Sequence, residues 1–125
     1  MSQPLYNPAL EKFLASYIET ALWSETDDAG IPFDNSKYAS LEFAPETVER
    51  MTADCARFIE LCAPILDATT TLYPVAHDFW LTRNHHGAGF WDGDYPESIG
   101  KALTDLAHSF GECDLYIGDD GKLYL

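Results

Sequence analysis

The sequence predicts an α+β fold in which two or three helices pack on one face of a small antiparallel sheet built from hairpins. Two observations lead to this prediction. Three segments repeat their apolar residues with the helical period, and each begins at a proline, whereas the last twelve residues alternate with the period of a strand. Because 125 residues suffice for a self-contained core, we expect one domain over residues 1–125.

The first helix is expected after Asn7-Pro8, where Asn7 is a good N-cap. The sequence Asp27-Asp28-Ala29-Gly30 predicts its end near Thr26. One face carries apolar residues at helical spacing: Leu10, Phe13, Leu14, Tyr17, Ile18, Ala21 and Leu22.

Two further helices are expected after Ala44-Pro45 and after Tyr95-Pro96. The earlier one should end or kink at Pro64, and the later one should stop at Gly111. The inner stripe of the earlier helix is Val48, Met51, Cys55, Ile59, Cys62 and Leu66, with Phe58 beside it. The stripe of the later helix is Ile99, Ala102, Leu103, Leu106, Ala107 and Phe110.

Hairpins are expected to supply the sheet. Asp120-Gly121 predicts a turn that places Leu115, Ile117, Leu123 and Leu125 on one face and Tyr116 and Tyr124 on the other. A second hairpin is expected from residues 78–83 and 89–92, although a short helix after Pro74 also fits the spacing. The long connection over residues 27–44 has room for a short edge strand over residues 38–43. We expect a shared core of Leu14, Ile18, Ile59, Leu103, Leu106 and Ile117.

The net charge of −14 argues against direct binding to nucleic acids or anionic membranes, which requires Lys and Arg. It is compatible with a basic protein partner, with mimicry of the DNA phosphate backbone, or with simple solvation of the surface. The acidic residues are spread evenly along the sequence. The first residues lack a signal-peptide pattern, and no apolar run approaches the ~20 residues that span a bilayer, so we expect a soluble cytoplasmic protein.

Few residues have a spacing that is typical of catalysis or metal binding. Cys55 and Cys62 lie ~10 Å apart along one expected helix, too far for a disulfide, and buried free thiols are the expectation. Cys113 stands between Glu112 and Asp114, whose carboxylates should oppose a reactive thiolate. We therefore expect no catalytic residue, no metal site and no cofactor.

The densest group of informative side chains lies in residues 77–94. Adjacent aromatic pairs flank Gly87 and Gly89, and Arg83 lies between them. We expect Arg83 to pair with Asp78, Asp92 or Asp94, or to stack on an indole, beside one partly exposed tryptophan. In the alternative, both indoles are buried and Arg83 covers them. The candidate binding residues are Trp80, Arg83, His85, Trp91, Asp92, Asp94 and Glu97.

The segment from Asp78 to Asp92 resembles a family of small acidic proteins encoded by bacteriophages, prophages and related mobile elements. The resemblance extends to residues 44–47 and the following helix, to Asp54-Cys55, and to residues 116–124. It covers most of residues 44–125 and implies an origin in a phage or mobile element. The family has no assigned activity, so the resemblance implies no catalytic residue.

Size, acidity and this resemblance predict a non-enzymatic accessory or counter-defence protein that binds a host protein with a basic surface. In its sharper form the hypothesis is mimicry of a nucleic acid. The alternative is a small-molecule-binding protein or enzyme that uses residues 77–94.

Overall fold

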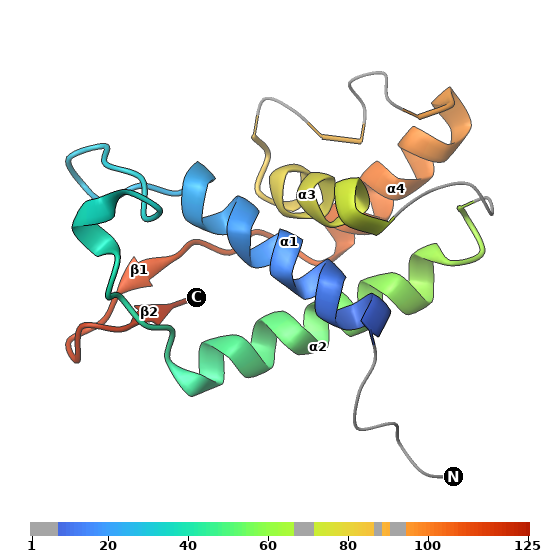
Figure 1. The fold of residues 1–125 in the computed structure, drawn as a ribbon. Helices are drawn as coiled ribbons and strands as arrows, with labels where there is room; N and C mark the ends of the chain where they lie inside the picture. Colours follow the sequence, from blue (N-terminus) through green and yellow to red (C-terminus); the bar gives the residue numbers. More distant parts are fainter. Residues whose placement is uncertain (1–7, 67–71, 87–88, 91–94) are drawn as a thin grey trace, which may run out of the picture.

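The chain folds into four α-helices and one short hairpin within the residues that the computed structural model describes, which are 8–66, 72–86, 89–90 and 95–125. The helices are α1 (Pro8–Ser24), α2 (Pro45–Cys62), α3 (Leu72–Arg83) and α4 (Glu97–Ser109). A 3-10 helix, Ser36–Tyr38, lies between α1 and α2. The strands β1 (Tyr116–Ile117) and β2 (Leu123–Tyr124) pair antiparallel (Figure 1).

The prediction of helices on a hairpin sheet is therefore wrong, because the described residues are mostly helical and the sheet has two strands. The error arises at residues 72–83, which form α3 and not the first strand of a hairpin, so the alternative of a short helix around Pro74 is the one that is confirmed. This helix is buried on nearly every side, including Val75, Phe79, Trp80 and Thr82. A helix that is buried all round has no polar face, so its sequence lacks the amphipathic period by which helices are identified.

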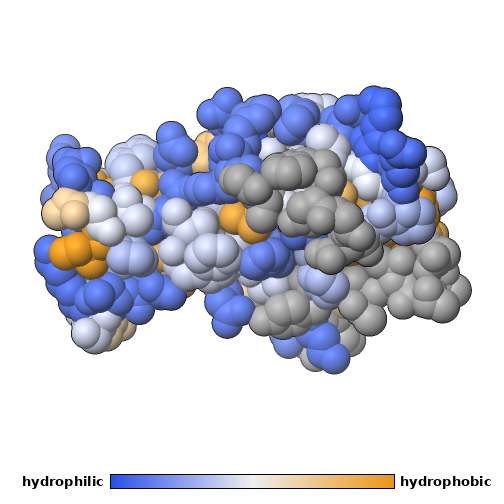
Figure 2. Space-filling model, turned by 90° about the horizontal axis from the view of Figure 1, so that it is seen from above, coloured by the Kyte–Doolittle hydropathy of each residue, from blue (hydrophilic) through white to orange (hydrophobic). Residues whose placement is uncertain are grey.

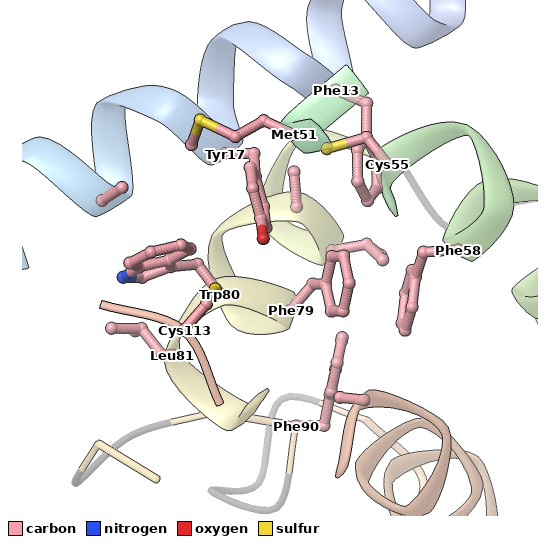
Figure 3. Packing of buried hydrophobic residues seen from close by; sticks show 14 of the residues in the cluster. Phe13, Tyr17, Met51, Cys55, Phe58, Phe79, Trp80, Leu81, Phe90 and Cys113 are labelled. Carbon is pink, nitrogen blue, oxygen red and sulfur yellow. The ribbon is translucent and has the colours of Figure 1, made fainter. Parts of the chain in front are cut away.

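The helices (Figure 1) surround a core rich in aromatic side chains, which Figure 3 shows from close by. α1 packs against α2 and α3, and α4 packs against the same two helices from the other side. At the centre the ring of Phe79 stacks on that of Phe58, with centroids 3.9 Å apart, and the ring of Phe90 is stacked with Phe58 at 5.9 Å. Burial of large aromatic side chains of this kind is the main stabilising contribution in a domain of this size.

The three proline-led helices begin as the sequence predicts. α2 begins at Pro45 and ends two residues before Pro64, and Gly111 takes a φ of 79° just after α4. The inner face of α2 differs by one position, because Phe58 is fully buried whereas Ile59 is partly buried and Val48 is exposed. Asn7 lies outside the described residues.

Of the expected core, Leu103 is fully buried, and Ile117 is 40% exposed. Four residues are partly buried against the core: Leu14, Ile18, Ile59 and Leu106.

The C-terminal hairpin is confirmed, with Tyr116 opposite Tyr124 and Ile117 opposite Leu123. In place of the expected edge strand over residues 38–43, Phe43 forms a single parallel bridge to Leu123. The N–H of Ala44 donates to the carbonyl of Leu123, and the N–H of Leu123 donates to that of Glu42. These bonds attach the hairpin to the start of α2.

Within the described ranges, every helix is too short or too polar to cross a membrane.

Candidate functional site

Trp80, the first candidate binding residue, is a core residue. Its side chain is 0% exposed, and its indole Nε1 donates a hydrogen bond of 2.9 Å to Ser24 Oγ. The indole also meets the ring of Tyr17 edge-on, with centroids 5.2 Å apart. Trp80 therefore joins α3 to α1 and is not a surface anchor for a partner.

Arg83 is also buried, with 1% of its surface exposed. Its Nη1 donates to Tyr17 Oη at 2.9 Å and to Asp54 Oδ2 at 2.8 Å. Its Nε and Nη2 donate to the carbonyls of Gly111 and Phe110, at 2.8 and 3.0 Å. One side chain thus connects α3 to α1, α2 and the end of α4.

Of the expected partners of Arg83, Asp78 is corrected, whereas Asp92 and Asp94 lie outside the described residues. Among the described residues, the acid that pairs with Arg83 is Asp54 of α2, and the guanidinium lies over the rings of Phe79 and Phe110. Asp78 instead accepts a hydrogen bond of 3.0 Å from the hydroxyl of Tyr95. The sequence does not indicate the pair of Asp54 and Arg83, because the two residues lie 29 positions apart and no local pattern connects them.

The remaining candidate residues are dispersed or lie outside the description. His85 is exposed at the end of α3, where its ring stacks on that of His108 at 4.5 Å and its Nε2 lies 3.6 Å from Glu112 Oε2. Glu97 is exposed in the first turn of α4. Trp91, Asp92 and Asp94 lie outside the described residues, so the expectation of a partly exposed tryptophan at position 91 stays a prediction.

The cysteines are buried free thiols, as expected. Burial raises the pKa of the Cys62 thiol to about 11, and burial likewise raises the pKa of Cys55 and Cys113. Since the thiolate is the nucleophile, these side chains are poorly suited to covalent catalysis. No group of three or more His, Cys, Asp or Glu that could hold a metal occurs in the described part of the chain.

His86 and Glu25 form a partly buried pair at the end of α1, with 3.1 Å between His86 Nε2 and Glu25 Oε2. Burial raises the pKa of the Glu25 carboxyl, and the nearby charge of Asp114 acts in the same direction. Hydrogen bonds from His86 and from the backbone of Leu115 oppose this effect. Glu25 thus ties α1 to α3 and to the segment before β1.

The fold gathers acidic residues that are dispersed in the sequence. Residues 25–46 and 112–125 lie side by side, since Phe33 and residues 26–28 border the same hollow as residues 115–117. Together these two segments carry ten of the 21 acidic residues and two of the seven basic ones. We call this part of the molecule the acidic end. The connection between α1 and α2 and the hairpin, which belong to it, lie on the left in Figure 1.

One carboxylate of the acidic end, that of Asp27, is held in place by hydrogen bonds. Asp27 accepts hydrogen bonds from the hydroxyl of Tyr38 and from the N–H groups of Ala29 and Ile31, and these bonds lower its pKa. The acids Asp28, Asp34 and Asp119 are exposed. The lowered pKa keeps the Asp27 carboxyl ionised at neutral pH.

Exposed apolar residues accompany this charge. The exposed large hydrophobic residues of the described chain are Trp23, Val48, Tyr116 and Ile117, and two of these four are consecutive in β1. Figure 2 shows a small hydrophobic patch among hydrophilic residues at this end. A hollow of about 560 Å³ opens beside β1 and the hairpin turn.

A second hollow, of about 490 Å³, lies between the start of α4 and the preceding segment. It is lined by Phe90, Tyr95, Gly100, Lys101 and Asp105, among others. This hollow adjoins residues 77–94, which sequence reasoning proposed as a ligand site.

No protein-family model, curated protein or solved structure matches the chain.

Sequence reasoning partly identified the hairpin surface. The alternation around Asp120-Gly121 places Tyr116 and Tyr124 on one face, and their rings do stack, with centroids 5.8 Å apart. The contribution of residues 26–34 was missed, because no local pattern connects them to a hairpin some 90 positions later. The two segments form one acidic surface only because these residues pack beside β1 in the folded chain.

Proposed function

We propose that this protein is a non-enzymatic binding protein whose acidic end holds a basic surface of a host protein. The observation that supports this proposal is the gathering of ten acidic residues and two basic ones at one end of the molecule. Because the sequence resembles phage and mobile-element proteins, the role that we propose is that of an accessory or counter-defence protein.

A physical cost favours recognition over solvation. Like charges that are brought together repel one another and destabilise the compact state. An acidic surface that only keeps a protein in solution gains nothing from concentration at one end. A concentrated field, by contrast, accelerates encounter with a basic partner and sets the orientation of the complex.

The sharper form of the proposal is mimicry of a nucleic acid. Carboxylates that replace phosphates would occupy a basic groove of the partner, so the protein and duplex DNA would compete for it. Affinity would then fall steeply with salt, since the interaction is electrostatic and screened within about 8 Å at physiological ionic strength.

The test compares two variants that each lose three negative charges. The first neutralises the acidic end (Asp28→Asn, Asp34→Asn, Asp119→Asn). The matched control neutralises exposed acids elsewhere (Glu60→Gln, Glu97→Gln, Asp105→Asn). Each immobilised protein is incubated with lysate of the host cell at about 0.05 and 0.5 M NaCl. A protein that wild type and control capture at low salt, and that the first variant does not, supports the proposal.

Equal capture by the two variants contradicts the proposal, because the position of the charge would then be irrelevant. For a captured protein, displacement by duplex DNA supports mimicry. Simultaneous binding of the captured protein to DNA and to this chain rejects mimicry and leaves a plain protein complex.

The second candidate function is binding of a small molecule, and the hollow beside Phe90 and Tyr95 favours it. Its wall combines aromatic rings with the ammonium of Lys101 and the carboxylate of Asp105, which themselves pair at 3.1 Å. A ligand here should raise the melting temperature of the wild-type protein and not that of a Lys101→Met variant. Equal shifts in the two proteins would place the ligand elsewhere.

A further inference from the structure

The hairpin presents an aromatic surface of fixed geometry. The rings of Tyr116 and Tyr124 stack with an interplanar angle of 23°, and Tyr116 is 52% exposed. The hydroxyl of Tyr124 donates a hydrogen bond of 2.7 Å to Asp120 Oδ2, and the pKa of Tyr124 rises to about 12. Tyr124 therefore stays neutral and supports the ring of Tyr116 from behind.

Two carboxylates, those of Asp119 and Asp120, border this aromatic surface. Asp120 is committed to the hairpin, because it accepts hydrogen bonds from both Tyr124 Oη and the N–H of Lys122. Asp119 is exposed and borders the same hollow as Tyr116 and Ile117. The lining of the hollow contains the carboxyl groups of Asp119 and Asp120 and no Lys or Arg, so the hollow favours a positively charged ligand.

We propose that this hollow binds an arginine side chain on an exposed segment of the partner protein. The proposal deepens the function proposed above and rests on it. The guanidinium would stack on the exposed ring of Tyr116 and donate to the carboxylate of Asp119, while the apolar stem would lie against Ile117.

The chemistry of the hollow favours arginine over lysine. A guanidinium is flat, weakly hydrated and able to stack on an aromatic face while its edge donates to a carboxylate. An ammonium is compact and strongly hydrated, and it gains less from an exposed ring. A flat exposed ring beside a carboxylate therefore distinguishes the two cations.

The experiment uses the full chain and the peptide acetyl-Gly-Arg-Gly-amide. Binding is followed by the chemical shifts of backbone amides in NMR spectra, which locate the site and give the dissociation constant. Two further peptides replace arginine with lysine or with citrulline, which keeps the planar shape and lacks the charge. The protein variants are Tyr116→Ala, Tyr116→Phe and Asp119→Asn, with Glu97→Gln as a control that removes a charge from α4.

We expect the arginine peptide to shift the amides of residues 115–124 most strongly. Tyr116→Ala and Asp119→Asn should each weaken binding by about two- to fivefold, as exposed cation–π pairs and ion pairs do. Tyr116→Phe keeps the ring and should bind as wild type does, as should Glu97→Gln. The citrulline peptide should cause little shift.

Three results would overturn the proposal. Shifts spread over all acidic surfaces would indicate unspecific attraction. Equal affinities for the arginine and lysine peptides would indicate charge alone. Wild-type affinity in folded Tyr116→Ala would exclude the ring. If Tyr116→Ala does not form the hairpin, two other comparisons still decide the question. One compares the citrulline and arginine peptides on the wild-type protein. The other compares the arginine peptide on Asp119→Asn and on the wild type.

The outcome is separable from that of the proposed function. Failure of the arginine peptide, together with host-protein capture that depends on the acidic end, rejects the arginine site alone. In the opposite case, the arginine peptide binds specifically and neutralising the acidic end does not change capture of the host protein. This result rejects the proposed function and leaves the arginine site as a property of the hairpin.

Discussion

Arg83 illustrates how one residue can be essential to a fold and absent from its surface. Its guanidinium donates to two carbonyls at the end of α4, groups that have no partner within a helix. It also neutralises Asp54 and orients the hydroxyl of Tyr17. The residue that sequence reasoning placed at a binding surface is therefore a structural connection among four helices.

We expect Arg83→Met to lower the free energy of unfolding by about 3–5 kcal/mol, since it leaves buried acceptors and the Asp54 carboxylate without their cation. Urea denaturation followed by circular dichroism measures this change. The control is Arg57→Met, which removes an arginine paired with Glu60 at 3.9 Å on the surface. Arg57→Met should lower the free energy of unfolding by less than about 1 kcal/mol. Similar losses in both variants would contradict the structural role of Arg83.

Glu25 gives the protein a defined response to pH. Because its pKa in the folded state is raised, mainly by burial, the folded protein holds this proton more tightly than the unfolded chain does. Its contribution to stability is therefore present below the pKa of an ordinary glutamate and is lost as pH rises through the folded value.

We expect Glu25→Gln, which stays neutral, to become more stable relative to wild type as pH rises from about 4 to 7. The measurement is the free energy of unfolding of both proteins at intervals over this range. The control is Glu97→Gln, an exposed glutamate of α4. A constant difference between Glu25→Gln and wild type over the whole range would contradict the assigned cause.

Among the elements, α4 depends on a close approach that helix propensity does not predict. A Cβ added at Gly100 would lie 2.7 Å from the carbonyl oxygen of Phe90. Gly100 is buried within the helix, and the atom that it would meet belongs to the backbone. The glycine thus allows α4 to pack against the segment that carries Phe90 into the core.

For Gly100→Ala, packing and helix propensity therefore predict changes of opposite sign in the free energy of unfolding. Propensity alone predicts a gain of roughly 0.5–1 kcal/mol for alanine inside a helix. The close contact predicts a loss, which we expect to be about 1–3 kcal/mol, as in other overpacked cores. Urea denaturation decides between them, and a stabilised variant would show that α4 is not held against Phe90. Ser98→Ala, exposed two positions earlier, is the matched control for propensity.

For the whole molecule, the acidic end sets the response to salt. The two adjacent segments carry ten carboxyl groups and only two lysines, so repulsion among the carboxylates outweighs their attraction to the lysines. Dissolved salt screens this repulsion. Repulsion between charges of the folded state lowers its stability relative to the unfolded chain, where the same charges lie farther apart.

We expect the melting temperature of the wild type to rise with NaCl concentration. The variant with Asp28, Asp34 and Asp119 neutralised should melt about 2–5 °C higher than wild type at low salt and respond less to NaCl. The variant with Glu60, Glu97 and Asp105 neutralised loses two surface ion pairs, so it should melt no higher than wild type. Calorimetry at several salt concentrations measures both. An equal gain in the two variants would mean that the acidic end carries no special repulsion.

The sequence by itself determined the elements whose signals are local. The starts of α1, α2 and α4, the stops at Pro64 and Gly111, and the hairpin at Asp120-Gly121 each depend on residues within a few positions. Proline fixes φ and glycine accepts positive φ whatever the rest of the chain does. These are the features that sequence reasoning predicts correctly.

Only the tertiary structure decided the nature of α3, the partner of Arg83 and the acidic end. The sequence of α3 fits a strand and a short helix alike, since a helix that other elements cover on nearly every side has no polar face to distinguish it. Asp54 and Arg83 meet because α2 and α3 flank the same core, and residues 26–34 join residues 112–125 because the hairpin packs beside them. Charge that is even along the chain thus becomes concentrated in space, since position in a fold depends on packing and not on distance in sequence.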